Sequence, residues 1–278
     1  MRAGVISRTD DQEALEITQR IINYLESQGV EATVETDTAL ALELEEHNTN
    51  LQDLDGDFVI TIGGDGTILR AAMEMKTSNT PLFGVNMGRR GFLSEVAPYD
   101  IEKAIQRLID GDYAIEESLK VKSWSIGMSD VFPDALNEVL IASSLPSKML
   151  LMRLSIDGNF ITDIQADGAI ISSPTGSTAY NMSAGGSIIA PNMNALSLTV
   201  ICPYSYFRSL VFPASSTVRI ELLKPRTDGM AIIDGRSYTA LKPGSVIEAT
   251  ASEKMTRFIR FEPFYSRIQK RLVHLQTS

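Results

Sequence analysis

The sequence predicts an α/β N-terminal domain with a parallel sheet, an all-β, sandwich-like C-terminal domain, and a C-terminal tail that returns to the first domain. Strand and helix signals alternate through the first third of the 278 residues, strand signals dominate from about Tyr113, and a helical pattern returns at Phe264–Leu272. This length suits one large domain or two of ordinary size. We place the boundaries at residues 1–112, 113–260 and 261–278.

The first domain alternates apolar runs with amphipathic stretches, which is typical of a parallel sheet covered by helices. Asp10 or Asp11 can cap the first helix, and Gly29 ends it. The segment Asp37–Asn50 is acidic and weakly patterned, so we expect a solvated surface excursion without function. The expected strands are Ala3–Ser7, Val30–Glu35, Asp57–Ile62 and Pro81–Val85; the first helix has apolar positions at Leu15, Ile21, Ile22 and Leu25, and the later helices are Ile68–Met75 and Ile101–Ile109.

The second domain shows strand patterns with hairpin turns between them. Asp157-Gly158-Asn159 and Asp234-Gly235-Arg236 have the composition of tight hairpin turns. Many short strands without intervening helices predict a sandwich or stacked sheets. The expected strands are Lys122–Met128, Ala135–Ala142, Leu150–Ile156, Phe160–Ile164, Ala169–Ser172, Leu196–Cys202, Thr217–Leu222 and Met230–Ile233.

Composition excludes several classes of function. The net charge of −10 argues against a nucleic-acid partner, although a local anion site built from backbone amides remains open. Cys202 is the single cysteine and the only histidines are His47 and His274, so a disulfide framework, a zinc site and a Ser-His-Asp triad are all disfavoured. The sequence has no apolar signal core and no run of transmembrane length, and we expect a cytoplasmic protein without a membrane partner.

The first motif is Gly63–Thr67 (GGDGT), between the expected strand DFVITI and the expected helix ILRAAMEM. Its glycines let backbone N–H groups approach a ligand, and the helix start adds N–H donors and a positive dipole end, which predicts a phosphate-binding loop. A carboxylate repels phosphate, so Asp65 is better explained as a general base for an attacking hydroxyl or as a group that helps to hold Mg²⁺ on the phosphates. The alternative is an ordinary turn with Asp65 as the helix N-cap.

The second motif is a run of small residues from Ala166 to Gly186, typical of a strand, a hydroxyl-rich turn and a helix start. Hydroxyl groups suit a ligand rich in amides and ribose. Tyr180 is suited to stacking on a base, and Asp167 to accepting a hydrogen bond from a ribose hydroxyl. The alternative is a Ser/Thr-rich turn with helix caps. The hydroxyl residues are Ser172, Ser173, Thr175, Ser177, Thr178 and Ser183.

A third feature is the polar pair Asn137-Glu138 inside the expected strand ALNEVLIA. Adjacent residues of a strand point to opposite faces, so at least one of the two is expected to be buried or to lie at a cleft. The alternative is an edge strand or a turn.

Together these stretches resemble the NAD kinase family. The matching segments are Gly63–Thr67, Gly84–Leu93 (GVNMGRRGFL), Leu136-Asn137-Glu138 and Asp167–Gly186, in the family's order and spacing, and the resemblance spans roughly Val59 to Gly235. GGDG alone also resembles loops of diacylglycerol kinases, sphingoid-base kinases and some phosphofructokinases. The long second motif is specific to NAD kinases.

The resemblance implies that ATP phosphorylates the adenosine-ribose 2′-hydroxyl of NAD, with Asp65 as general base. A divalent metal, Mg²⁺, is expected with ATP, polyphosphate is an alternative donor, and no side chain is assigned as a metal ligand. The family's fold is an α/β domain plus a β-sandwich domain, in homodimers or homotetramers where a neighbouring subunit can complete the site. The residues expected to bind the nucleotides are Gly63, Gly64, Gly66, Thr67, Arg70, Phe92, Asn137, Glu138, Lys148, Gln165, Asp167, Thr175, Thr178, Ala179, Tyr180, Ser183 and Arg236.

Within this set the resemblance implies separate roles. The glycines line the phosphates and Phe92 borders the nucleotide pocket. Asn137 and Glu138 hold ribose and adenine-side groups, and Asp167 contacts the nicotinamide side. The segment from Thr175 to Ser183 forms the adenine and carboxamide pockets.

Three positions depart from the family's pattern. Many relatives carry Arg where this chain has Gln165, His where Tyr204 follows Pro203, and Arg-Pro where it has Arg208-Ser209. These departures concern phosphate and subunit contacts and leave the expected reaction unchanged.

Two other functions stay open. A related kinase for a lipid or sugar-phosphate hydroxyl shares the GGDG loop, although a lipid kinase should show an apolar or basic membrane surface. A non-catalytic NAD(P)-binding regulator has no need for the carboxylate of Asp65.

Overall fold

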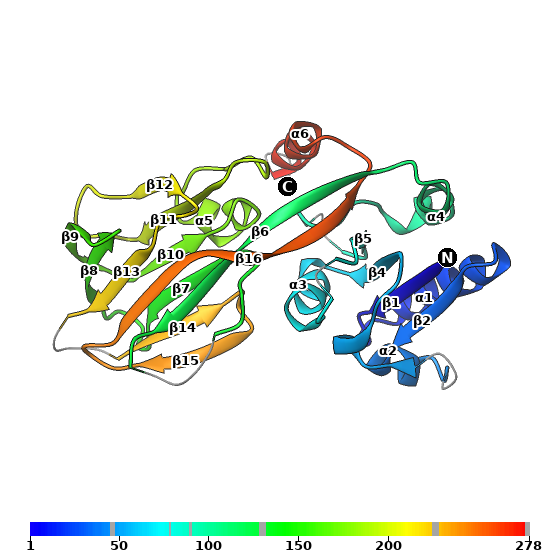
Figure 1. The fold of residues 1–278 in the computed structure, drawn as a ribbon, viewed down its shortest axis with the longest axis horizontal. Helices are drawn as coiled ribbons and strands as arrows, with labels where there is room; N and C mark the ends of the chain where they lie inside the picture. Colours follow the sequence, from blue (N-terminus) through cyan, green and yellow to red (C-terminus); the bar gives the residue numbers. More distant parts are fainter. Residues whose placement is uncertain (45–47, 78, 89–90, 128–131, 224–227, 276–278) are drawn as a thin grey trace. The chain divides into compact units, whose positions relative to one another are not determined.

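The chain forms two compact units in the computed structural model (Figure 1). The first unit combines Met1–Glu117 with Thr256–Ser278, and the second is Ser118–Met255. Two long strands, β6 (Ala114–Ser125) and β16 (Val246–Arg260), run from one unit into the other. The structure describes all residues except 45–47, 78, 89–90, 128–131, 224–227 and 276–278, so parts of the expected segments Asp37–Asn50 and Lys122–Met128 lie outside the described residues.

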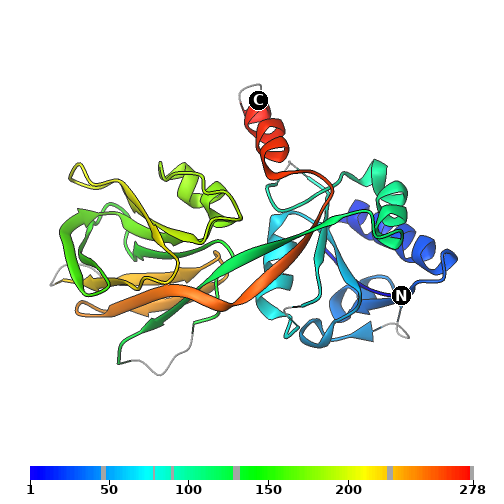
Figure 2. The same ribbon diagram turned by 45° about the horizontal axis from the view of Figure 1, so that its top comes forward.

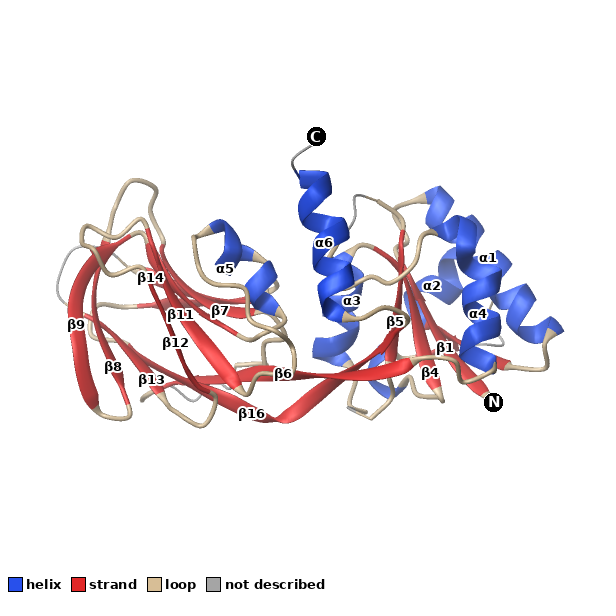
Figure 3. Ribbon diagram, turned by 90° about the horizontal axis from the view of Figure 1, so that it is seen from above, coloured by secondary structure: helices blue, strands red, loops and turns tan. Residues whose placement is uncertain are grey.

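The sheet of the first unit is parallel in every described pairing, with the strand order β3-β2-β1-β4-β5 and the end of β16 beside β5. Helices α1 and α4 cover one face and α3 the other (Figure 3). The predicted α/β fold is confirmed. The elements are β1 (Arg2–Ser7), α1 (Gln12–Ser27), β2 (Glu31–Glu35), α2 (Thr36–Ala41), β3 (Asn48–Thr49), β4 (Phe58–Gly63), α3 (Asp65–Glu74), β5 (Leu82–Asn86) and α4 (Ile101–Ile109).

Helix α1 shows how the local sequence sets an element's ends. The Asp11 carboxylate accepts hydrogen bonds from the N–H groups of Glu13 (3.1 Å) and Ala14 (3.3 Å), which caps the helix start. Gly29 takes a φ of 74° beyond the helix end, a conformation that glycine adopts without strain. The helix buries one stripe of side chains at helical spacing, namely Ala14, Thr18, Ile21, Ile22 and Leu25.

The expectation for Asp37–Asn50 is wrong in part. Its first residues belong to helix α2, which buries Thr38 and Ala39 against the sheet, and β3 pairs with β2 as an edge strand. The buried carboxylate of Glu35 caps α2 by accepting a hydrogen bond from the Thr38 N–H at 3.1 Å. A helix of six residues is too short to show a helical period in the sequence.

The second unit has two sheets that pack as layers (Figure 2), which confirms the predicted all-β domain. One sheet has the antiparallel order β16-β13-β8-β9, with β6 also beside β16, and the other has the antiparallel order β12-β11-β10-β7-β14-β15. The strands are β7 (Glu138–Ser143), β8 (Leu150–Ile156), β9 (Asn159–Ala166), β10 (Gly168–Ser172), β11 (Ala195–Ile201), β12 (Ser209–Pro213), β13 (Val218–Leu222), β14 (Gly229–Ile233) and β15 (Ser237–Leu241), with a short helix α5 (Tyr180–Ser183).

Both predicted hairpin turns are present. Asp157 and Gly158 have φ values of 51° and 76°, and Asp234 and Gly235 have 48° and 65°, as tight primed turns require. The expected strands do not include the long strand β16, nor β12 and β15, which are the two edges of the six-stranded sheet. Edge strands are partly solvated and therefore lack the apolar pattern that reveals central strands.

The C-terminal tail forms helix α6 (Phe264–Leu275), which belongs to the first unit. Arg267 of this helix pairs with Glu116 at 2.6 Å, and Arg271 donates hydrogen bonds to the carbonyl groups of Phe92 and Ser94. The predicted return of the tail to the first domain is confirmed. Among the described residues, no helix combines the length and the apolar character needed to cross a bilayer.

Candidate functional site

The GGDGT loop lies where parallel α/β sheets commonly bind ligands. The order of strands along the sheet reverses between β1 and β4, and the loop follows β4 at its carboxyl end. Ser7 at the end of β1 is level with Ile62 near the end of β4. A switch point of this kind opens a crevice outside the carboxyl ends of the two strands.

The backbone of the loop approaches its neighbours closely. A Cβ atom on Gly63 would collide with the hydroxyl of Thr67, and the Gly63 carbonyl accepts a hydrogen bond from the Met87 N–H at 2.9 Å. Gly64 is the N-cap residue of α3 and has no side chain with which to cap it. A helix start without a side-chain cap favours an anion. The local geometry therefore suits phosphate.

Asp65 is the first residue of α3, so its interpretation as the N-cap is wrong. Its carboxylate accepts hydrogen bonds from the backbone N–H groups of Phe92 (Oδ2, 2.8 Å) and Leu93 (Oδ1, 3.2 Å). Gly91 touches the same carboxylate, and a Cβ there would overlap it. The loop after β5 thus fixes the orientation of Asp65.

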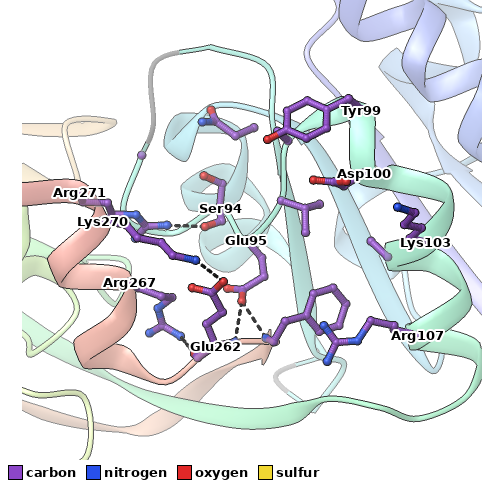
Figure 4. Close-up of a pocket in the computed structure, with 16 residues that line it drawn as sticks. Ser94, Glu95, Tyr99, Asp100, Lys103, Arg107, Glu262, Arg267, Lys270 and Arg271 are labelled. Carbon is purple, nitrogen blue, oxygen red and sulfur yellow. Dashed lines mark hydrogen bonds and ion pairs between the residues drawn. The ribbon is translucent and has the colours of Figure 1, made fainter. Parts of the chain in front are cut away.

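A cavity of about 610 Å³ lies in the first unit (Figure 4), and its lining includes Gly91, which touches this carboxylate. It is lined by the loop after β5, which includes Gly91, and by side chains of α4 and α6. Arg271 of α6 reaches the loop through the carbonyls of Phe92 and Ser94, the latter at 2.5 Å. Burial, with a contribution from Arg260, lowers the pKa of Arg271 to about 10, whereas the charge of Asp65 acts in the opposite direction.

Two other predicted residues of this unit are engaged by the protein itself. Arg70 pairs with the carboxylates of Glu35 (3.2 Å) and Asp37 (3.4 Å). The ring of Phe92 lies 5.2 Å from the guanidinium carbon of Arg271. Phe92 therefore belongs to the loop beside the cavity, whereas the guanidinium of Arg70 is directed to the acids near α2.

In the second unit, β7 begins at Glu138 and lies between β10 and β14, so the edge-strand interpretation is wrong. Asn137 lies in the bend that precedes β7, outside the strand in which it was expected. The buried carboxylate of Asp234 accepts three backbone hydrogen bonds, from the N–H groups of Leu136 (2.7 Å), Asn137 (2.8 Å) and Glu138 (2.9 Å). One side chain thereby fixes the backbone at the start of β7.

Asn137 is buried and Glu138 is half-buried, and each side chain has a buried oxygen atom that is not hydrogen-bonded to any described residue. Asn137 Oδ1 and Glu138 Oε2 have no hydrogen-bond partner among the described residues. Burial, followed by the charge of Asp234, raises the pKa of Glu138 to about 8, against a hydrogen bond from the Tyr180 backbone. Buried polar atoms without partners cost free energy, so this pair is suited to a polar ligand that forms hydrogen bonds with both side chains.

The hydroxyl-rich turn of the second motif docks on the same residues. The Ser173 N–H donates to the Asn137 carbonyl at 2.9 Å, and a Cβ on Gly176 would collide with that carbonyl. The Ser173 hydroxyl accepts a hydrogen bond from the Gly176 N–H (3.0 Å), and the Ser177 hydroxyl accepts one from the Ile189 N–H (2.9 Å). These two hydroxyls build the turn, as the alternative interpretation of a Ser/Thr-rich turn proposed.

The remaining residues of this turn vary in exposure. Thr178 is buried, and its hydroxyl donates to the Thr175 carbonyl at 3.1 Å. Ala179 is half-buried, and Tyr180 and Ser183 are exposed at the two ends of α5. The turn therefore presents Tyr180 to solvent close to the half-buried side chain of Glu138, to which the Tyr180 backbone is hydrogen-bonded.

Not all predicted residues of the second unit gather there. Asp167 precedes β10, and the far end of that strand, Ser172, is level with Glu138. Ser172 lies five residues after Asp167 along the strand, which is about 16 Å at the usual rise. Gln165 and Lys148 are exposed, in β9 and in the loop after β7. Arg236, in contrast, lies in the turn that carries Asp234.

Two residues that position the candidate site residues were not predicted from the sequence, namely Asp234, which holds the start of β7, and Gly91, beside Asp65. From the sequence, we interpreted Asp234 only as a turn residue, although an aspartate directly after a buried strand was a usable signal. Gly91 lay inside the matching segment GVNMGRRGFL, of which residues 89 and 90 lie outside the described residues. Within the described part of the chain, no three His, Cys, Asp or Glu side chains form a group that could hold a metal ion.

Comparison with known proteins agrees with these features. The family model of the ATP-NAD kinase N-terminal domain matches residues 3–113, and that of the ATP-NAD kinase C-terminal domain matches residues 136–261. The chain belongs to the NAD kinase family. The resemblance predicted from the motifs is therefore confirmed, and so is the prediction of an enzyme.

Relatives of this family match nearly the whole chain. An NAD kinase of Methanothermobacter thermautotrophicus is 37% identical over 276 residues, which cover 98% of this chain and 96% of the relative. The crystal structure of an NAD kinase from Archaeoglobus fulgidus in complex with ATP has a TM-score of 0.78 and 28% identity, with 98% of both chains covered. Yeast NADH kinase complexed with NADH shares the fold, with a TM-score of 0.88 at 24% identity, and covers 100% of this chain and 88% of its own.

Proposed function

We propose that the protein transfers the γ-phosphoryl group of ATP to the 2′-hydroxyl of the adenosine ribose of NAD, with Asp65 as the general base. The observation that carries this proposal is the position of Asp65. It is a carboxylate in a phosphate-binding loop, held in one orientation by the N–H groups of Phe92 and Leu93. A loop that only bound phosphate would be weakened by this charge, whereas a loop that phosphorylates a hydroxyl needs an acceptor for its proton.

In the proposed step, the 2′-oxygen attacks the γ-phosphorus in line and its proton passes to Asp65. The bond between the γ-phosphorus and the bridging oxygen of ADP breaks, and NADP and ADP are the products. The Gly63–Thr67 loop and the start of α3 bind phosphate oxygens through backbone N–H groups. Positioning and charge stabilisation supply most of the rate enhancement in such reactions.

Mg²⁺ is proposed to enter as part of the Mg-ATP substrate. In enzymes of this kind the ion is usually held by one or two carboxylates together with substrate phosphates. Asp65 fits that requirement as a single carboxylate at the phosphate loop, and no group of three metal-binding side chains exists among the described residues. When bound, the ion neutralises charge on the phosphates.

NAD recognition is assigned to the second unit. Burial keeps the pKa of Glu138 near 8, so at neutral pH its carboxyl group is largely protonated and can donate a hydrogen bond to the ligand. Asn137 supplies an unsatisfied acceptor, and Tyr180 an exposed ring for stacking. Asp167 lies at the other end of β10, and we assign it, with Gln165, to the site of a neighbouring subunit in a homodimer or homotetramer.

The test is NADP formation from NAD and Mg-ATP, read through an NADP-specific dehydrogenase. Asp65→Asn keeps the size of the side chain and removes the base, and we expect the rate to fall at least about 10²-fold with NAD binding retained. Asp53→Asn is the matched control, because Asp53 is an exposed carboxylate of the same unit that pairs with Lys76.

The outcomes separate the candidate functions. If Asp65→Asn stays within a few-fold of the wild type, Asp65 is not the base. NADP formed with polyphosphate but not with ATP keeps the function and changes the donor. NAD binding without NADP formation from either donor supports the regulator, and phosphorylation of a lipid or sugar phosphate instead of NAD supports the related kinase.

A cytoplasmic location is part of the same proposal.

A further inference from the structure

The loop after β5 connects the Asp65 carboxylate with a positively charged side chain of α6. The Leu93 N–H donates to Asp65 Oδ1 at 3.2 Å. The Phe92 carbonyl belongs to the same peptide group as this N–H, and it accepts a hydrogen bond from the guanidinium group of Arg271. Hydrogen bonds in a chain polarise one another, so a positive charge at the carbonyl strengthens the N–H as a donor. A single peptide group therefore lies between Arg271 and the Asp65 carboxylate.

Arg271 binds the loop with both arms of its guanidinium group. The second nitrogen donates to the Ser94 carbonyl at 2.5 Å (Figure 4), and the guanidinium carbon lies 5.2 Å from the centre of the Phe92 ring. One rigid, planar group thus holds the carbonyls on both sides of Leu93, which the single ammonium group of a lysine would not do. Holding these two carbonyls fixes the direction of the Leu93 N–H.

Arg260 also contacts the loop, but on a different peptide group. It donates to the Leu93 carbonyl at 2.7 Å, and the N–H of that peptide group belongs to Ser94, whereas the N–H groups that bind Asp65 belong to earlier residues. The charge of Arg260 is compensated by two carboxylates, at 2.9 and 3.3 Å. Arg271 is therefore the arginine whose hydrogen bond reaches a peptide group that donates to Asp65.

A buried ion pair fixes the position of α6 and hence of Arg271. Arg267 lies four residues before Arg271, so the two side chains share one face of the helix. Arg267 pairs with Glu116 of β6 at 2.6 Å, and both of these side chains are largely buried. Arg267 also donates to the Glu262 carbonyl at 3.2 Å. This pairing docks one turn of α6, and the next turn places Arg271 against the loop.

Stability alone does not explain an arginine at this position. Among the described residues Arg271 forms no ion pair, and its hydrogen bonds go to uncharged carbonyls. Burial, followed by the charge of Arg260, lowers the pKa of Arg271 to about 10, so the folded state disfavours its charge. The negative charge of Asp65 acts in the opposite direction. A charge kept in unfavourable surroundings next to a functional carboxylate indicates a functional role.

We propose that Arg271 is a positioning residue for the transfer reaction, because it holds the peptide group whose N–H orients the Asp65 carboxylate. Arg271 acts through the Phe92–Leu93 peptide group, and its effect falls on the rate of the transfer step. The inference rests on the proposed function in taking Asp65 as the base. The hold of Arg271 on the loop does not depend on that function, and the experiments separate the two.

The first experiment measures NADP formation at a temperature at which every variant is folded. Arg271→Met removes the guanidinium group and keeps a long side chain. A displacement of about 1 Å in a reacting group costs about 10²-fold in rate, so for a partial loss of orientation we expect kcat to fall about tenfold. The KM for NAD should stay unchanged, because the groups assigned to NAD recognition lie in the second unit. Arg271→Lys keeps the charge without the fork, and its kcat should be intermediate.

Arg20→Met is the matched control. Arg20 is an exposed arginine of the same unit, and its guanidinium group is bonded to the carboxylate of Glu102 at 2.7 Å instead of to the loop. Its kcat and KM values should equal those of the wild type.

The second experiment measures amide hydrogen exchange, which needs no activity. Because a hydrogen bond to a charged group is a strong one, the Phe92 and Leu93 amides of Arg271→Met should exchange at least about tenfold faster than in the wild type. The amides of β4 that pair with β1 should exchange as in the wild type, whereas a loss of global stability would accelerate them as well.

The outcomes decide the proposal. Wild-type exchange at both loop amides, or a wild-type kcat in Arg271→Met, overturns it. A raised KM for Mg-ATP with an unchanged kcat also overturns it, because Arg271 then acts on the donor. The double variant Asp65→Asn/Arg271→Met should be about as slow as Asp65→Asn, and a fully additive loss would show that Arg271 acts independently of Asp65. If Asp65→Asn stays active, the proposed base fails, and faster exchange in Arg271→Met still supports the hold on the loop.

Discussion

Gly91 offers the sharpest test of how the loop after β5 orients Asp65, the proposed base. A Cβ at this position would overlap the carboxylate of Asp65, with Cγ and both oxygens inside normal contact distance. Two backbone N–H groups, of Phe92 and Leu93, hold the carboxylate against the loop at 2.8 and 3.2 Å. Gly91→Ala must therefore push the carboxylate away or break these hydrogen bonds.

The expected effect is large on the rate and moderate on stability. A displacement of about 1 Å in a reacting group costs about 10²-fold in rate, and overpacking by one methyl group costs about 1–3 kcal/mol of stability. We expect kcat for NADP formation to fall about 10²-fold while NAD still binds, because the groups assigned to NAD recognition lie in the second unit. Steady-state kinetics with a thermal unfolding curve for each variant measure both quantities.

Gly88→Ala is the matched control, since a Cβ at Gly88 meets no atom within 4 Å. The double variant Asp65→Asn/Gly91→Ala distinguishes the mechanism. If Gly91 acts through Asp65, the double variant should be about as slow as Asp65→Asn alone, because coupled sites are not additive. Equal activity of Gly91→Ala and Gly88→Ala, or fully additive losses in the double variant, would refute the reasoning.

Two further predictions concern the second unit. Asp234→Ala leaves three backbone N–H groups without an acceptor, so we expect the free energy of unfolding to fall by at least about 3 kcal/mol and the KM for NAD to rise. Asp163→Ala is the control, because Asp163 is exposed and pairs with Arg153. Equal melting temperatures of the two variants would contradict the role of Asp234. Glu138 has a pKa raised from 4.5 to about 8, so the native state keeps a proton that the unfolded state has lost, and stability should fall as pH rises through this window and level off above it. This loss of unfolding free energy is on the order of 3 kcal/mol, and Glu138→Gln should remove it because its side chain does not ionise. The melting temperature of Glu138→Gln should therefore exceed that of the wild type by more at pH 8 than at pH 5. The same difference at both pH values would contradict the assignment.

The long, regular patterns of the sequence predicted elements well. Helix α4 occupies Ile101–Ile109 and strand β8 occupies Leu150–Ile156, as expected, because each buries one face with a full period of apolar residues. Short or partly solvated elements were not visible, such as α2 and the edge strand β15. Their stability comes from packing and from single hydrogen bonds, which leave no periodic trace.

For the candidate site, the sequence predicted roles that depend on adjacent residues, but not which residues from distant positions contact each other. The glycines and carboxylate of Gly63–Thr67 predicted a phosphate loop, because backbone approach and charge depend on adjacent residues. The partners of Asp65 lie 27 and 28 positions away, at Phe92 and Leu93, and Asp234 binds the backbone of Leu136 across 98 positions. No local pattern encodes such a pairing.

The sequence by itself determined the fold class and the family resemblance, and it predicted a phosphate-binding loop, since these depend on residue types at short spacing. Only the tertiary structure decided which groups meet: Gly91 against Asp65, the turn of the second motif against Asn137, and α4 with α6 around one cavity. The physical reason is that burial and charge act through space. A side chain's partners, and therefore its pKa and its free lone pairs, are set by elements that the chain brings together from distant positions.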